Sequence, residues 1–79
     1  MQVNYDPHYN VAYIKLREKS DEIETIKISD ELNVDISADG KIYGFELLNA
    51  NDQLGIKGHP IFTFINENNH QKQELPLSL

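Results

Sequence analysis

Polar side chains occupy every second position of one short segment, and their types make them the first candidates for chemistry. Asn33, Asp35 and Ser37 alternate with apolar residues, so they share one face of a predicted strand. Glu46, in the next predicted strand, would stand opposite Asn33 and diagonal to Asp35. Two carboxylates placed in this way could hold a hard cation or act as acid and base. The simpler interpretation, which we favour, is a solvated sheet face that carries polar groups.

A second candidate set surrounds a predicted turn near the N-terminus. Tyr5, Asp6, Asn10 and Tyr13 could line a small pocket. A turn closed by Asp6 and Asn10, with the tyrosines packed beside it, explains the same residues without a ligand. The candidate surface or pocket residues are therefore Tyr5, Asp6, Asn10, Tyr13, Asp35 and Glu46.

Other patterns that indicate catalysis or metal binding are missing from the sequence. His8, His59 and His70 fall in three separate predicted loops, so a histidine metal site is not expected. The chain has no cysteine and no Gly-x-Ser-x-Gly elbow, and neither a lysine nor a hydroxyl residue follows Gly55-x-x-Gly58 as in a phosphate loop. We therefore expect that the protein is not an enzyme, that it has no catalytic or metal-binding residue and that it binds no cofactor.

The balance of charge indicates whether a nucleic acid or a protein is the more suitable partner. Tyr13, Lys15 and Arg17 share one strand face, as a sheet that stacks on RNA would need. The acidic residues nearby are Glu18, Asp21, Glu22 and Glu24. The whole chain has 13 acidic and 7 basic residues, for a net charge of −6, which disfavours nucleic acid and favours a basic protein.

Length and composition predict one small cytoplasmic domain. A chain of 79 residues has room for a single core of modest stability. The absence of cysteine fits a reducing compartment. The first residues carry no signal-peptide pattern, and no apolar run approaches the ~20 residues of a membrane span. Neither export nor membrane association is expected.

The clearest structural signal is a hairpin over residues 32–47, in which Asp39-Gly40 joins two alternating runs. A two-residue loop is preferred because it places six apolar residues on one face. The predicted pairs are Leu32 with Leu47, Val34 with Phe45 and Ile36 with Tyr43. The alternative, a three-residue loop with a bulge at Gly40, would set Val34 against Gly44 and lose this apolar face.

The remaining elements follow from alternation and from turn residues. Further strands are predicted at residues 2–5, 11–17, 23–29 and 61–65, with an extended edge segment at 74–79. A helix competes at 23–29, but β-branched residues favour the strand. Ala12, Ile14 and Leu16 form the expected core side of their strand. Residues 49–60 hold two glycines and a proline, so they predict a long connection.

The predicted fold is therefore mainly β. It is a small antiparallel β-meander sheet over residues 1–50, followed by a C-terminal extension, 51–79, that is extended or irregular with room for a short helix. Both parts would pack as one domain. No amphipathic helix covers the apolar face of the predicted sheet, so a homodimer or another partner is expected to do so.

Two motifs carry a family resemblance. They are Tyr5-Asp6-Pro7-x-x-Asn10-x-x-Tyr13-Ile14 and Val34-Asp35-x-x-x-Asp39-Gly40-x-x-x-Gly44-Phe45-Glu46-Leu47-Leu48-Asn49-Ala50. In this order they resemble the small prokaryotic family called domain of unknown function 2283, the YuzE-like proteins, over roughly the first fifty residues. The resemblance implies antiparallel strands and very little chemistry. Some members are suspected, from gene neighbourhood, of pairing with small toxin-like proteins.

Three functions remain open after these observations. The first is a non-catalytic protein-binding module, an antitoxin-like or regulatory partner of a small basic protein. The second is a self-associating structural domain. The third is a small-ligand or metal-binding protein, or an enzyme, that uses Asp35, Glu46 and the tyrosines. The negative charge and the lack of a catalytic set favour the first.

Overall fold

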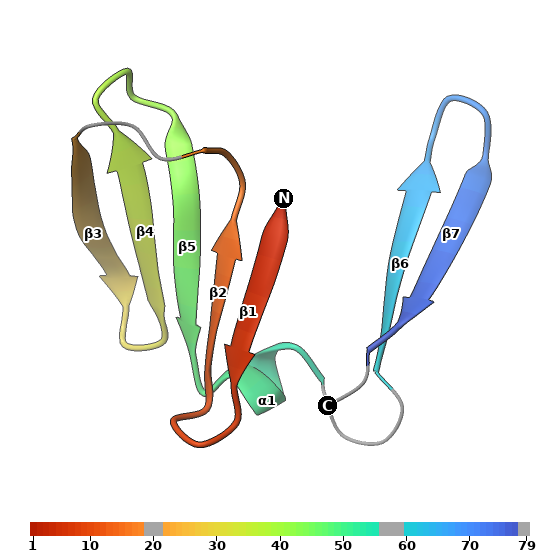
Figure 1. The fold of residues 1–79 in the computed structure, drawn as a ribbon, viewed down its shortest axis with the longest axis horizontal. Coiled ribbons are helices and arrows are strands. Elements are labelled where there is room, and N and C mark those ends of the chain that lie inside the picture. The colour runs from red at the N-terminus through yellow and green to blue at the C-terminus, as the bar shows by residue number, and fades with distance from the viewer. Residues whose placement is uncertain (19–21, 56–59, 78–79) are drawn as a thin grey trace.

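The computed structural model describes residues 1–18, 22–55 and 60–77, and this part of the chain forms seven strands and one short helix (Figure 1). The elements are β1 (Gln2–Asp6), β2 (Val11–Lys15), β3 (Ile23–Ser29), β4 (Leu32–Ser37), β5 (Ile42–Leu48), α1 (Ala50–Gln53), β6 (Ile61–Asn66) and β7 (Gln71–Pro76). The predicted mainly β, antiparallel fold is confirmed.

Five strands form the main sheet, in the order β1-β2-β5-β4-β3 (Figure 1). Each pair of neighbours is antiparallel. The strand order differs from the predicted β-meander, because β2 pairs with β5 instead of β3. This long-range pairing joins the N-terminal hairpin to the rest of the sheet. All candidate side chains on β2, β4 and β5 are thereby brought together.

The sheet has one apolar and one polar face, as the alternation predicts. Cross-strand partners share a face. The apolar face includes the pairs Val3 with Ile14, Ala12 with Leu47, Val34 with Phe45 and Ile26 with Val34. The polar face includes the pairs Tyr13 with Glu46, Asn33 with Glu46 and Thr25 with Asp35. The candidate chemistry lies on the polar face.

The β4–β5 hairpin corrects the predicted loop. Leu32 pairs with Leu47 and Val34 with Phe45 as predicted, but Ile36 pairs with Ile42 instead of Tyr43. The Ser37 N–H donates to the Lys41 carbonyl at 2.8 Å, and the Gly40 N–H donates to the Ser37 carbonyl at 2.9 Å. The loop therefore has three residues, Ala38 to Gly40, and a bulge at Tyr43 restores the apolar register beyond it.

Backbone conformation explains why the longer loop forms. A two-residue type I′ turn needs positive φ at both central residues, which would include Asp39. The three-residue loop needs it only at Gly40, whose φ is +82°. The three-residue loop shifts the pairing of β4 with β5 by one residue, and the bulge at Tyr43 reverses that shift. This arrangement keeps the apolar pairs aligned and avoids a positive φ at Asp39. It introduces one irregularity, the bulge at Tyr43 in β5.

Leu16 lies outside its predicted place on the core side of its strand, and Ile28 of β3 is also exposed. β2 ends at Lys15 instead of residue 17, and the side chain of Leu16 beyond it is 38% exposed. The pairing of β3 with β4 shifts between Lys27 and Ser29, which leaves Ile28 in a bulge and 59% exposed. Ala12 and Ile14 are buried as predicted.

The predicted long connection after β5 contains the helix α1. Ala50 is fully buried against Ala12 and Ile14, so this single turn covers one end of the apolar face. The prediction left room for a short helix, but periodicity could not place it because it is only one turn long. No helix in the described ranges is long and apolar enough to cross a bilayer.

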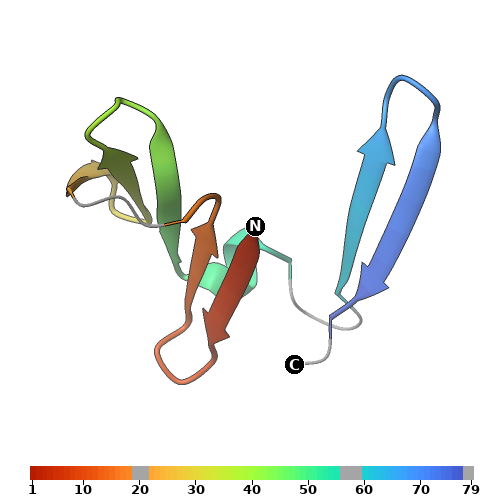
Figure 2. The ribbon, with the colours of Figure 1, turned by 45° about the horizontal axis from the view of Figure 1, so that its top comes forward.

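β6 and β7 form a separate two-stranded sheet, the C-terminal hairpin, which stands to one side of the main sheet in both views (Figures 1 and 2). Strands are predicted in both places, and the second runs over Gln71–Pro76 instead of 74–79. Residues 78–79 lie outside the described residues. Packing of 51–79 on 1–50 as one domain stays a prediction.

Candidate functional site

A hydrogen-bonded network on the polar face joins three strands through Asp35. The Tyr13 hydroxyl donates to Asp35 Oδ2 at 2.6 Å, and the Thr25 hydroxyl donates to Asp35 Oδ1 at 2.6 Å. Tyr13 lies on β2, Thr25 on β3 and Asp35 on β4. Because β5 separates β2 from β4, the Tyr13 side chain must pass over β5 to reach the carboxylate.

Gly44 provides the space for that crossing. It is buried and pairs with both Lys15 and Asp35. A Cβ at Gly44 would lie 2.8 Å from the Tyr13 hydroxyl oxygen and 2.6 Å from the Ile14 carbonyl oxygen, closer than Cβ contacts normally come. A glycine is therefore needed here for close approach, although its φ is not positive.

The environment of Tyr13 favours its neutral form. Burial and then the hydrogen bond to Asp35 raise the pKa of the Tyr13 phenol far above its ordinary value of 10.0. A phenol that holds its proton in this way is a hydrogen-bond donor and a poor base or nucleophile near neutral pH. The ring of Tyr43, the bulged residue, lies beside it with centroids 6.4 Å apart.

Glu46 has a partner of its own on the same face. The Asn33 side-chain amide donates to Glu46 Oε1 at 3.0 Å, and the two residues pair across the strands as predicted. Asp35 and Glu46 thus each accept a hydrogen bond from a different donor. In residues 1–18, 22–55 and 60–77, no three acidic, histidine or cysteine side chains gather to form a metal site.

The N-terminal candidates do not form one pocket. Tyr5 pairs with Ala12 and packs against the small core on the apolar face, whereas Tyr13 belongs to the polar face. Asp6 Oδ1 accepts the backbone N–H groups of His8 at 2.9 Å and Tyr9 at 3.3 Å, so it closes the turn as predicted. These contacts give Tyr5 a packing role and Asp6 a turn role.

Asn10 attaches α1 to the β1–β2 turn. Its side-chain amide donates to Asn51 Oδ1 at 2.8 Å and to Asn49 Oδ1 at 3.2 Å, while its own Oδ1 accepts the Asn51 N–H at 2.8 Å. The Asn10 carbonyl also accepts the Ala50 N–H at 3.0 Å. Sequence reasoning missed this cluster because its members are about forty positions apart, and the recurring asparagines were its only signal.

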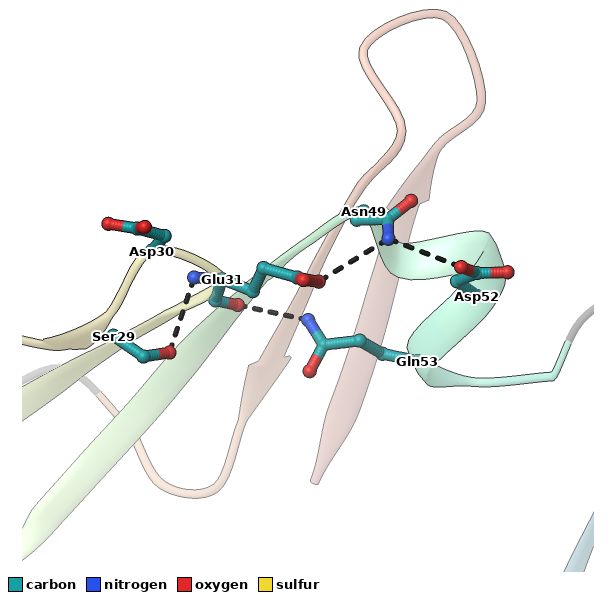
Figure 3. Close-up of a pocket in the computed structure, with 6 residues that line it drawn as sticks. All are labelled: Ser29, Asp30, Glu31, Asn49, Asp52 and Gln53. Carbon is teal, nitrogen blue, oxygen red and sulfur yellow. Dashed lines mark hydrogen bonds between the residues drawn. The ribbon is translucent and has the colours of Figure 1, made fainter.

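A shallow depression of about 570 Å³ lies where the β3–β4 turn approaches α1 (Figure 3). Its lining is Ser29, Asp30, Glu31, Asn49, Asp52 and Gln53. The Gln53 amide donates to the Glu31 carbonyl at 3.0 Å, and the Asn49 amide is 3.4 Å from both Glu31 Oε2 and Asp52 Oδ2. The contacts of Gln53 and Asn49 with Glu31 hold α1 to the sheet. Of these residues, only Asn49 belongs to a motif noted in the sequence.

Lys15 and Arg17, the two cations that an RNA-binding strand face would need, contact other residues of the chain. Arg17 Nη2 donates to Ser37 Oγ at 2.9 Å and lies 3.2 Å from Asp39 Oδ1. The Lys41 backbone N–H and then Arg17 lower the pKa of the Asp39 carboxyl. Lys15 lies 4.0 Å from Glu18. Arg17 therefore ties the end of β2 to the β4–β5 loop.

The predictions at His59, Gly58 and Asp21 concern positions outside the described residues. His8 and His70 lie in the β1–β2 and β6–β7 turns, in agreement with their predicted loop positions.

The apolar face of the main sheet is only partly covered within the chain. Val3 and Ile26 on this face are 53% and 37% exposed, and no large side chain in the described residues is fully buried. α1 covers only the end near Ala12 and Ile14. A sheet normally buries such a face against a second layer.

Residues 2–51 match the model of a family described as Protein of unknown function (DUF2283). The chain belongs to this family. The DUF2283 region spans the whole five-stranded sheet and the start of α1, and it ends before the C-terminal hairpin. No curated protein and no solved structure matches the chain.

The motif residues of this DUF2283 chain have structural roles. Asp6 closes a turn, Asn10 holds α1, Gly44 gives Tyr13 passage to Asp35, and Gly40 takes the positive φ of the loop. These motif residues thus each hold a part of the architecture of residues 2–51.

Proposed function

We propose that this protein is a non-catalytic protein-binding module that docks another protein surface on the apolar face of its five-stranded sheet. The observation that carries the proposal is the exposure of that face, on which Val3 and Ile26 are 53% and 37% accessible. Exposed apolar area rimmed by polar residues is typical of protein interfaces.

The arrangement of the polar face supports the non-catalytic part of the proposal. Asp35 accepts two hydrogen bonds from Tyr13 and Thr25, and Glu46 accepts one from Asn33. Through these bonds Asp35 connects β4 to β2 and β3, and Glu46 connects β5 to β4. The two carboxylates therefore have a structural role in holding the strands of the sheet together.

Charge favours a basic partner. The net charge of −6 attracts a cationic protein over distance and speeds the encounter. Asp30, Glu31 and Asp52 add a local acidic surface beside α1. A small basic protein with an apolar patch is the partner class that fits both features. Self-association as a structural domain is the second candidate, and the exposed apolar residues of the C-terminal hairpin favour it.

Site-specific photo-crosslinking in the cells that make the protein tests the proposal. A photoreactive residue replaces Val3 or Ile26 on the apolar face, and Asn4 or Lys27 serves as the control on the opposite face of the same strands. Crosslinks to protein are expected from the first two positions and not from the controls, with the partner identified by mass spectrometry.

The crosslinking pattern decides between the functions. Equal crosslinking from both faces, or none from Val3 and Ile26, would contradict docking on the apolar face. A heterologous basic partner supports the regulatory module, and a second copy of the chain supports the structural domain.

A further inference from the structure

We infer that the protein forms a homodimer in which the β6–β7 hairpin of each chain covers the apolar face of its partner's five-stranded sheet. This inference rests on the proposed docking through the apolar face and takes up its second candidate, self-association, since it names a second copy of the chain as the occupant. A second copy supplies what one chain lacks, because each chain carries both an uncovered face and an unpacked hairpin.

The surface area of the chain indicates a missing contact. The accessible surface is 6203 Å², whereas a compact monomer of 9.1 kDa exposes about 4,900 Å². The excess is about 1,300 Å² per chain. Burying it in a symmetric pair would remove roughly 2,600 Å² in total, which lies in the range of permanent homodimer interfaces.

The dimensions of the chain agree with the surface area. Its Cα radius of gyration is 14.3 Å, compared with about 11.6 Å for a compact domain of this length. The separate hairpin accounts for the difference, since it stands away from the sheet in both views (Figures 1 and 2).

The hairpin has an apolar face suited to this contact. Phe62 pairs with Leu75, and Phe64 lies two residues along the same strand, so the three side chains share one face. Phe62 is 44% exposed, Phe64 is 52% exposed and Leu75 is 61% exposed. A two-stranded hairpin is marginally stable in water by itself, and packing these side chains on a second sheet would stabilise it.

Charge is placed on the other side of the hairpin. Lys72 and Glu74 form an ion pair at 2.8 Å, and they pair with Ile65 and Thr63, on the opposite face from Phe62 and Phe64. The face that would enter the interface therefore carries no charge among these paired residues. Two chains of net charge −6 associate best through such an apolar contact, since it brings few like charges together.

Reciprocal exchange gives a closed dimer. The hairpin of each chain covers the sheet of the other chain, so each apolar sheet face and each hairpin is buried. A two-fold axis then relates the two copies. The contact occurs twice, so the assembly stops at two chains.

Analytical ultracentrifugation of the full chain at micromolar concentration provides the first test. Twice the chain mass of 9.1 kDa is expected for the wild type. Phe64→Glu places a charge on the docking face of the hairpin and is expected to halve the mass. Ile65→Glu is the matched control, because Ile65 is also 52% exposed but lies on the opposite face, and this variant is expected to stay dimeric.

Complementation between two variants tests the exchange itself. Ile26→Glu damages the sheet face and leaves the hairpin intact, so it is also expected to be monomeric. A mixture of Ile26→Glu with Phe64→Glu restores one of the two hairpin-to-sheet contacts and is expected to give a mixed dimer. Recovery in the mixture supports exchange, and amide dispersion of each variant confirms that the main sheet is folded.

The outcomes separate this inference from the proposed function. A monomeric wild type would overturn the inference, and crosslinks from Val3 to another protein would then leave the proposed function standing. A wild-type dimer with no recovery in the mixture would also overturn the exchange. A monomer whose hairpin packs on its own sheet, together with no crosslinks from the apolar face, would overturn both proposals.

Discussion

The hydroxyl of Tyr13 on β2 lies 2.6 Å from Asp35 Oδ2 on β4, and the strand between them, β5, is crossed at Gly44. One side chain therefore connects two strands that do not pair with each other. The bond ties the N-terminal hairpin to the β3–β4 hairpin from above the sheet. The same three residues belong to the two motifs that carry the family resemblance.

Tyr13→Phe is expected to destabilise the protein by about 1.5 kcal/mol, because it removes a hydrogen bond to a carboxylate that is partly withdrawn from water. Urea unfolding at pH 7 measures the loss. Tyr9→Phe is the control at a tyrosine that is 73% exposed, and it should change stability by less than about 0.5 kcal/mol. Equal effects of the two variants would contradict a special role for Tyr13.

The stabilisation that Tyr13 supplies is expected to decline at alkaline pH. Its folded-state pKa is raised above the ordinary value of 10.0, so the unfolded chain loses the phenol proton first. Ionisation then favours the unfolded state, and stability falls as the pH rises above about 10. The difference between wild type and Tyr13→Phe should shrink from pH 9 to pH 11. A constant difference over this range would contradict the assigned shift.

Gly44→Ala is expected to cost about 1–3 kcal/mol, because the added Cβ would meet the Tyr13 hydroxyl and the Ile14 carbonyl oxygen. Thermal and urea unfolding measure the effect. The double variant with Tyr13→Phe should not recover wild-type stability, since the backbone contact remains. Full recovery would show that only the tyrosine restricts this position.

Gly40→Val is expected to destabilise by at least ~1 kcal/mol, because a β-branched residue resists the φ of +82°. No heavy atom lies within 4 Å of the position of a Cβ, so the effect comes from the backbone alone. Gly40→Asn should cost less, since asparagine tolerates positive φ. Equal stability of Gly40→Val and wild type in denaturant would contradict the observed loop.

Asp6→Ala is expected to lower stability by about 1 kcal/mol through the loss of the bonds to the His8 and Tyr9 N–H groups. Asp6→Asn retains an acceptor oxygen and should lose less. Photo-crosslinking from Val3 should persist in both variants. If crosslinking disappears while stability is unchanged, Asp6 is a binding residue instead of a turn residue.

Alternation and turn chemistry were sufficient to predict most strands and their faces. Ile23–Ser29 has the predicted bounds, the pairs at Val34 and Leu32 are correct, and Asp6 closes its turn. These features depend on residues close in sequence. The loop at Gly40 was misjudged because two irregularities compensate each other, and apolar pairing alone does not distinguish a bulged strand from a regular one.

The arrangement of the candidate site depended on contacts that the sequence does not display. Glu46 opposite Asn33 was predictable from one hairpin, whereas the partnership of Tyr13 with Asp35 requires β5 to lie beside β2. The attachment of α1 by Asn10 requires a turn and a helix that are far apart in the chain. Long-range pairing decides which polar residues meet, and local patterns carry little information about it.

The bulge in β3 between Lys27 and Ser29 also bears on aggregation. β3 is an edge of the main sheet, and a regular edge would be a template for adding strands from other molecules. The displaced Ile28 interrupts the ladder, while Glu24 and Lys27 place charges along the same strand. The regular part of this edge is therefore limited to residues 23–27, and an incoming strand could not continue in register beyond Lys27. A short, charged and interrupted edge of this kind disfavours cross-β growth.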